Sequence, residues 1–253
     1  RTVASAPAIT DASTFGKGGA IVKDYAGQNA KYVELLGAAA QNNWPDVLSV
    51  ARAADTLQAK LDAESEANLY RPTQIWPLLA LAEAKTGELA AARALIDRTP
   101  SDCGLCIRAR ARIRATEGDW NASAFWFALA VKQEPSIPFA YADWGTMLMA
   151  KGDLDGAIEK FREANLKGPH FADPLEMWGE ALMAKNRSDL ALAKFEDADK
   201  YAPNWGRLHL QWGEALYWSG DKAGAQKQFD VASGLDLTPP EISELARMRG
   251  THG

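Results

Sequence analysis

Residues 138–171, PFAYADWGTMLMAKGDLDGAIEKFREANLKGPHF, are one unit of a pattern that returns along the chain every 34 residues. Small and aromatic residues keep the same places in successive units. The aligned columns are Trp144-Gly145, Trp178-Gly179 and Trp212-Gly213; Ala157, Ala191 and Ala225; Phe161, Phe195 and Phe229; and Ala164, Ala198 and Ala232. A fixed period of this length is typical of stacked supersecondary units, none of which can bury its own apolar face alone.

Turn-forming residues divide each unit into two segments with helical spacing. The turn column holds Gly118-Asp119, Gly152-Asp153, Asn186-Arg187 and Gly220-Asp221. The second helix ends before a proline, which disfavours helical geometry in the residue preceding it, at Pro135, Pro169 and Pro203. We therefore predict regular helix pairs at 104–137, 138–171, 172–205 and 206–237.

Weaker versions of the pattern flank this regular block. Helical spacing predicts degenerate pairs at 29–60 and 73–101, the latter with a shortened second helix. A last helix at 239–249 follows Thr238 and Glu241, whose spacing suits a capping box, and we interpret it as a polar cap on the solenoid. Residues 1–23 are small and polar, which predicts a flexible lead-in or linker before a solenoid at 24–249.

Composition and charge exclude several classes of protein. Of 253 residues, 47% are apolar and 24% are charged, and the formal net charge is -5. Nucleic-acid-binding domains are usually basic, so we expect no nucleic-acid partner. No apolar run approaches the roughly 20 residues of a membrane span, so we expect no membrane insertion in this segment. Since the chain begins at Arg1, we expect a processed protein or a piece of a longer one, whose compartment stays open.

The repeated columns resemble the tetratricopeptide repeat family. Its signature reads here as Tyr141-x2-Trp144-Gly145-x2-Leu148, then Ala157-x3-Phe161, then Pro169. The resemblance is strong over 104–236, moderate over 73–101 and weak over 29–60, and its main departure is Trp where Leu is usual before Gly. It implies an all-α, right-handed solenoid of antiparallel helix pairs that binds proteins, without catalysis and without a cofactor.

Packing of each pair follows from the small and bulky columns. We expect Gly of the first helix to face Ala of the second, so that the two helices cross closely. Phe and Trp would then fill the space around the crossing, which places Trp144, Trp178 and Trp212 in the core rather than in a ligand-binding ladder. The sequence leaves open whether Trp205 and Trp218 pack between repeats or are exposed.

The resemblance also implies that the first helix of each pair lines the concave wall. The ridge opposite the core carries, in successive repeats, Arg108, Arg112 and Ala115; Ala142, Thr146 and Met149; Glu176, Glu180 and Met183; and Leu210, Glu214 and Tyr217. This wall changes from basic through apolar to acidic, so we expect a protein partner that presents a basic or amphipathic peptide or helix. The alternative is that these charges only solvate the surface. Glutamates on the wall argue against the carboxylate clamp of some family members.

Cys103 and Cys106 begin a predicted helix and are the only cysteines. A zinc site needs about four ligands, so we expect no metal site. The pair is either structural, reduced or joined as a disulfide, or it forms a regulatory disulfide, and the sequence leaves this open.

Motifs of hydrolases, metalloproteases and dinucleotide-binding enzymes are absent from the sequence, so we expect no catalytic residues. Two alternatives to a binding scaffold remain. One is a regulatory or sensory region of a longer multidomain protein, and the other is a self-associating solenoid.

Overall fold

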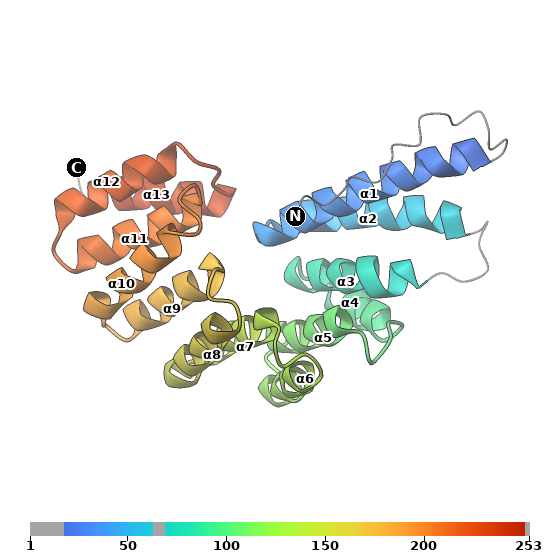
Figure 1. Ribbon diagram of the computed structural model, residues 1–253, viewed down its shortest axis with the longest axis horizontal. Helices are drawn as coiled ribbons and strands as arrows, with labels where there is room; N and C mark the ends of the chain where they lie inside the picture. Colours follow the sequence, from blue (N-terminus) through green and yellow to red (C-terminus); the bar gives the residue numbers. More distant parts are fainter. Residues whose placement is uncertain (1–17, 63–68, 251–253) are drawn as a thin grey trace, which may run out of the picture. The chain divides into compact units, whose positions relative to one another are not determined.

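The computed structural model describes residues 18–62 and 69–250, which are mainly α-helical and include no strand. The helices, which Figure 1 labels in chain order, fall into two compact units, unit 1 up to Pro100 and unit 2 from Ser101. Within each unit, helices that follow one another in sequence form pairs joined by short turns. The prediction of an all-α solenoid built from helix pairs is therefore confirmed.

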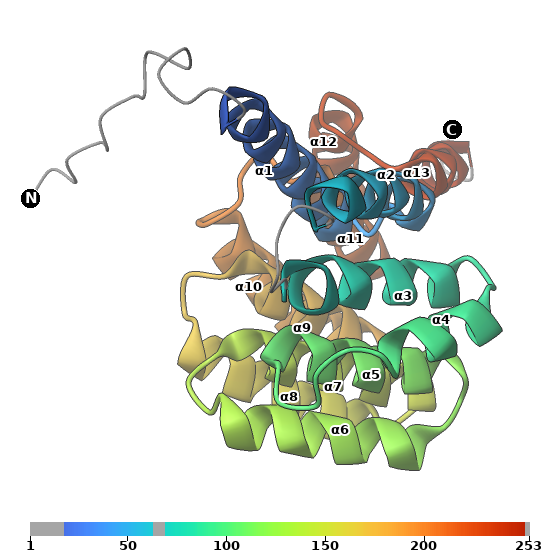
Figure 2. The same cartoon turned by 90° about the vertical axis from the view of Figure 1, so that its right-hand side faces the viewer.

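Unit 1 contains two helix pairs, which Figure 2 shows as α1 with α2 and α3 with α4. Their bounds are α1 (Gly18–Ala40), α2 (Trp44–Asp62), α3 (Trp76–Lys85) and α4 (Leu89–Ile96). A π-helical turn, η2 (Arg71–Ile75), leads into α3. Pro77 has no amide proton, and the N–H of Trp76 reaches back five residues to the carbonyl of Arg71, which is the π-type bond.

Two helix starts in unit 1 differ from the predicted ones. Residues 18–23 belong to α1, whereas the sequence predicts a lead-in as far as residue 23; the rest of that lead-in lies outside the described residues. Residues 20–26 include neither Gly nor Pro, so each extends the helix at little cost. The helical segment before α3 begins at Arg71 rather than near residue 73, because Pro72 fits the first turn of a helix.

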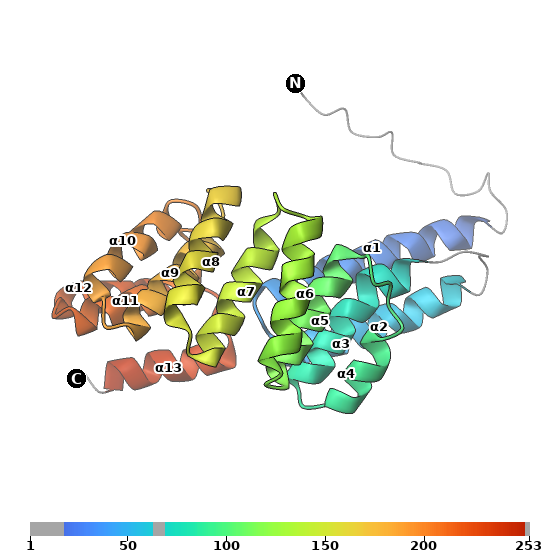
Figure 3. The ribbon, with the colours of Figure 1, turned by 90° about the horizontal axis from the view of Figure 1, so that it is seen from below.

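Unit 2 contains four pairs and a terminal helix, and Figure 3 shows its paired helices following one another in chain order. The first helices of the pairs are α5 (Gly104–Thr116), α7 (Pro138–Lys151), α9 (Ala172–Ala184) and α11 (Gly206–Trp218). The second helices are α6 (Trp120–Gln133), α8 (Leu154–Lys167), α10 (Ser188–Asp199) and α12 (Lys222–Ser233). The terminal helix is α13 (Pro239–Gly250).

The turn inside each pair of unit 2 needs a left-handed residue, followed in most copies by a capping aspartate. Gly152 has φ 88°, and Asn186, which replaces glycine in its own repeat, has φ 56°. Glycine adopts this conformation without steric cost, and asparagine tolerates it better than most residues. Asp153 then accepts the backbone N–H of Gly156 at 3.0 Å, which begins α8.

The close helix crossing is built differently from the prediction, because Gly faces the Phe ring of the second helix rather than Ala. A Cβ atom on Gly179 would lie 2.6 Å from Cε1 of Phe195. The side chains of Phe195 and Ala191 are fully buried. The same contact recurs between Gly145 and Phe161 and between Gly213 and Phe229. The glycine column therefore makes room for a buried aromatic ring.

The tryptophans of the repeated column are only partly buried, so the prediction that they lie in the core is confirmed only in part. Trp144 and Trp178 pack against buried residues on one side. Lys160 and Lys194 place their Nζ atoms 4.5 Å from the ring centroids of Trp144 and Trp178, respectively. The fully buried space beside the glycine of the first helix is already occupied by the Phe ring. Each indole therefore lies at the edge of the core, with one part against apolar side chains and its ring face near a lysine.

The remaining tryptophans behave in two ways. Trp212 is also partly buried, and the ring of His209 stacks on it with centroids 6.3 Å apart. Trp205 is partly buried and packs against the cluster around Leu175 and Phe195, whereas Trp218 is 64% exposed. Of the two residues that the sequence leaves open, one packs between repeats and the other faces solvent.

The terminal helix covers the last pair. Leu245 and Met248 of α13 are buried together with Leu210 and Phe229. The side chain of Glu241 accepts the backbone N–H of Thr238 at 2.8 Å, which is one half of the predicted capping box. Because α13 covers Leu210, this predicted wall residue of α11 is buried.

Candidate protein-binding surface

The first helices of unit 2, α5, α7, α9 and α11, carry the predicted ridge residues, and we call this surface the first-helix wall. At its basic end, Asp143 of α7 accepts two hydrogen bonds from Arg108 of α5, at 2.9 Å from Nε and 2.6 Å from Nη2. Nε of Arg112 lies 3.9 Å from the same carboxylate. The guanidinium of Arg108 also lies 5.2 Å from the ring centroid of Phe139. Both arginines therefore already have an anionic neighbour.

At the acidic end, Arg207 of α11 forms a cluster with three carboxyl groups. Its Nε donates to Oε1 of Glu176 at 2.9 Å, and its Nη2 donates to Glu180. Its Nη1 lies 3.9 Å from Oε1 of Glu241 on α13. Glu176 is fully buried, and its Oε2 has no hydrogen-bond partner. The cluster ties two first helices to the terminal helix.

Protonation within this cluster follows from burial and crowding. Burial raises the pKa of Glu176 well above its usual value of 4.5, and the neighbouring charge of Glu180 raises that pKa further. Arg207 opposes this effect and keeps its own proton, because the charge of Glu176 raises the pKa of the guanidinium. One cation facing three acids leaves the cluster with excess negative charge when the acids are ionised.

Two predicted wall residues are buried and cannot meet a partner directly. Leu210 is 1% exposed beneath α13, and Glu176 is 0% exposed beneath Arg207. The neighbouring first helix and the terminal helix cover this end of the ridge, which spacing within one helix cannot reveal. Thr146 is exposed. The other predicted wall residues are partly buried, namely Arg108, Arg112, Ala115, Ala142, Met149, Glu180, Met183, Glu214 and Tyr217.

A pocket of about 680 Å³ opens on the wall between α9 and α11. Its lining includes Glu180 and Met183 of α9, Asn186 of the following turn, and Gln211, Glu214 and Trp218 of α11. The indole N–H of Trp218 points to Oε1 of Glu214 at 3.4 Å, and its ring packs edge-on against Tyr217 at 5.3 Å between centroids. The pocket thus combines carboxylates with an exposed aromatic ring.

Three of the six pocket residues named above, Glu180, Met183 and Glu214, are residues that the sequence predicts on the wall. It missed Gln211, which lies one position outside the predicted ridge, and left Trp218 open. It also missed Asp143 and Arg207, the partners of the charged ridge residues. A signal for them does exist, since opposite charges stand 35 residues apart in Arg108 and Asp143 and 31 apart in Glu176 and Arg207. These separations are close to the repeat length, so they join neighbouring repeats.

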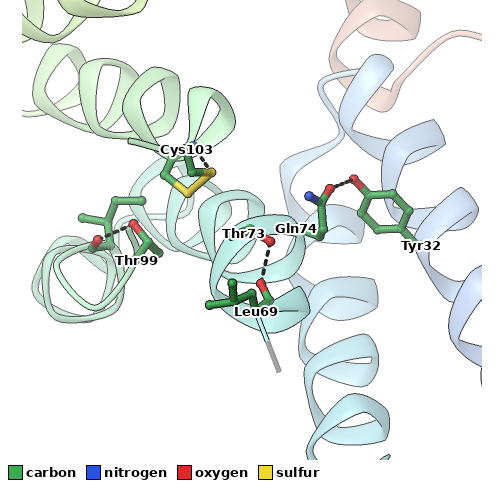
Figure 4. Close-up of a disulfide and its surroundings, with 8 residues drawn as sticks. Tyr32, Leu69, Thr73, Gln74, Thr99 and Cys103 are labelled. Atoms are coloured by element: carbon green, nitrogen blue, oxygen red, sulfur yellow. Dashed lines mark hydrogen bonds between the residues drawn. A yellow bond between two sulfur atoms is a disulfide. The ribbon is translucent and has the colours of Figure 1, made fainter. Parts of the chain in front are cut away.

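Cys103 and Cys106 form a disulfide at the start of α5 (Figure 4). Cys103 is the N-cap residue, and its Sγ accepts the backbone N–H of Cys106 at 3.2 Å. Cys106 is fully buried, whereas Cys103 is partly exposed. The bridge closes the first turn of the first helix of unit 2.

Neither metal-binding clusters nor membrane spans occur in the part of the chain that the structure describes. Across residues 18–62 and 69–250, no group of three or more His, Cys, Asp or Glu side chains is arranged to hold a metal ion. Over the same residues, every helix is too short or too polar to cross a bilayer.

Comparisons with known proteins identify the fold. No family model and no curated protein matches the chain. Among solved structures, PilF of Pseudomonas aeruginosa is similar with a TM-score of 0.57 and 16% identity, covering 72% of this chain and 86% of PilF. A crystal structure of MamA is similar with a TM-score of 0.50 and 17% identity, covering 67% of this chain and 99% of MamA. Both are tetratricopeptide repeat proteins, and at such identities the likeness concerns the fold alone. The chain therefore has the tetratricopeptide repeat fold that its sequence columns predict.

Proposed function

We propose that this chain is a non-catalytic scaffold that binds a peptide or helical segment of a partner protein on the first-helix wall of unit 2. The pocket between α9 and α11 carries the proposal. It places Met183 and the 64% exposed ring of Trp218 beside the polar groups of Gln211 and Glu214. Solenoids commonly bind other molecules on such extended walls.

The residue types of the pocket suit a protein ligand. Tryptophan, tyrosine and methionine are enriched at protein interfaces, where large apolar side chains provide most of the contact energy. Methionine adapts its shape to different partners. Trp218 and Tyr217 already pack edge-on, so a ligand would meet a partly ordered aromatic surface and lose less side-chain entropy on binding.

Selection of a peptide and mapping of its site test this function. Phage-displayed random peptides would be selected on the full chain, and the best synthetic peptide would be bound to two photo-cross-linking variants. One carries benzoylphenylalanine at Gln211 in the pocket, and the other carries it at Leu166, which is 70% exposed on α8. We expect cross-linking from position 211 and little from position 166.

Two outcomes would contradict the proposed function. Selection that yields no peptide binding above the bare matrix would remove the case for a peptide-binding scaffold. A selected peptide that cross-links only from position 166 would move the binding surface to the second helices.

A further inference from the structure

The pocket on the first-helix wall has an unbalanced charge. Glu180 and Glu214 contribute carboxylates to its lining, and no Lys, Arg or His belongs to that lining. Arg207 lies against Glu180, but it also serves Glu176 and approaches Glu241. Arg207 contacts Glu176, Glu180 and Glu241 but not Glu214, so Glu214 carries negative charge that no ion pair within the lining balances. The pocket is therefore an anionic site.

Three basic residues near the pocket form ion pairs with acids outside its lining. The pairs are Lys185 with Asp155, Arg187 with Asp189, and Arg247 with Glu244. Each joins the basic side chain to a carboxylate outside the pocket. Arg247 also attracts Glu214 through space, but its ion-pair partner is Glu244, so a cation inside the pocket itself would come from the ligand.

Apolar groups beside the carboxylates narrow the kind of cation. The indole of Trp218 lies next to Glu214, with its N–H directed to that carboxylate, so ring and charge form one surface. Met183 provides an aliphatic contact on the opposite helix. Such a site suits a charged head on an aliphatic stem, because the carboxylate attracts the head while the ring and thioether cover the stem.

We propose that Glu214, Glu180 and Trp218 recognise a lysine or arginine side chain of the bound segment. This inference rests on the proposed function and names the chemistry of its ligand. The partner segment is accordingly basic and amphipathic, with one cationic side chain in the pocket and its apolar residues against Met183 and the neighbouring wall.

Matched peptides test the inference directly. The probe is a fluorescein-labelled amphipathic helix of Lys, Leu and Ala, and its relatives replace every Lys by acetyl-lysine, Gln or Glu. Fluorescence anisotropy with the full chain measures the dissociation constants. We expect the Lys peptide to bind most tightly and to weaken as salt is added, because screening reduces the attraction between exposed charges.

Three variants locate the effect. Glu214→Gln and Trp218→Ala should each weaken binding of the Lys peptide by about fivefold, the size expected for one exposed ion pair or cation–π contact. Glu196→Gln is the matched control, because Glu196 is exposed on α10 away from the pocket, and it should leave the affinity for the Lys peptide unchanged. Circular dichroism would verify that each variant keeps the wild-type helix content.

The outcomes separate this inference from the proposed function. Equal binding of the acetyl-lysine or Gln peptide, or equal affinity of wild type and Glu214→Gln for the Lys peptide, would overturn basic-residue recognition. Absence of binding by the Lys peptide would overturn it too. If a selected peptide without Lys or Arg still cross-links from position 211, the scaffold function stands and only the inference fails.

Discussion

The contact between Gly179 and Phe195 is the sharpest test of how the repeats are built. A Cβ at position 179 would stand 2.6 Å from Cε1 and 2.7 Å from Cζ of the ring. Ordinary contact begins at about 3.4 Å, so the ring or the helix must move by most of an ångström. Phe195 is 0% exposed and is packed on several sides, so this movement disturbs its neighbours.

The expected cost follows from two opposing effects. Replacing a glycine inside a helix by alanine gains about 1 kcal/mol of helix propensity, while overpacking a core costs roughly 1–3 kcal/mol. The first pair of unit 2 has Ala111 in the glycine column with Phe127 still buried, so a pair of helices can adapt to one extra carbon. We therefore expect Gly179→Ala to destabilise unit 2 by about 1 kcal/mol, and Gly179→Leu by about 3 kcal/mol.

Thermal unfolding followed by circular dichroism measures this difference. For a unit of this size, 1 kcal/mol corresponds to roughly 2–4 °C, so Gly179→Leu should lower Tm by roughly 6–12 °C. Gly234→Ala is the matched control, because its Cβ would stand at an ordinary 3.6 Å from the nearest neighbour, the carbonyl of Val231. A Gly179→Leu protein that melts with the wild type would refute the packing account.

Three further predictions concern the ion cluster and the disulfide. Arg207→Met removes the cation beside buried Glu176 and should cost roughly 3–5 kcal/mol in urea unfolding at a pH where Glu176 is ionised. The double variant Arg207→Met/Glu176→Met should recover most of this loss, and a double variant as unstable as the single one would contradict the prediction. Because the folded-state pKa of Glu176 is raised above 4.5, its stabilising contribution is full below that pH and is lost as pH rises. Wild type should therefore lose more stability than Glu176→Gln as the pH rises above about 5, and parallel stability curves would disprove the buried-acid assignment. Reducing the Cys103–Cys106 bridge opens a four-residue loop and should cost about 2 kcal/mol, measured as Tm with and without reductant; an unchanged Tm after reduction verified by mass spectrometry would argue against a structural role.

The helix pairs could be predicted because their determinants are local and repeated. Each turn needs a left-handed residue and each crossing needs a small one, so Gly152 and Gly179 recur at a fixed distance from Phe161 and Phe195. The partner of the glycine could not be predicted, because sequence period does not specify the crossing geometry of two helices. Hence Gly was expected to face Ala and instead faces Phe.

The candidate site was harder to predict, because its chemistry depends on contacts between repeats. Spacing within one helix predicts Glu176, Glu180 and Glu214 on the same wall; Glu180 and Glu214 line the pocket, whereas Glu176 is buried. Its burial depends on Arg207, which lies 31 residues away on another first helix. Trp218 is exposed, as are Ala150 and Ala184 in the same column of the two preceding repeats.

The proposed function requires that the first helices of unit 2, and not the second ones, receive a protein segment. Hydrogen–deuterium exchange of the full chain, with and without the Lys-containing amphipathic peptide, measures where binding slows amide exchange. We expect slower exchange in α9, in α11 and in the turn around Asn186, with little change in α8, α10 and α12. Slower exchange confined to the second helices, or none at saturating peptide, would contradict it.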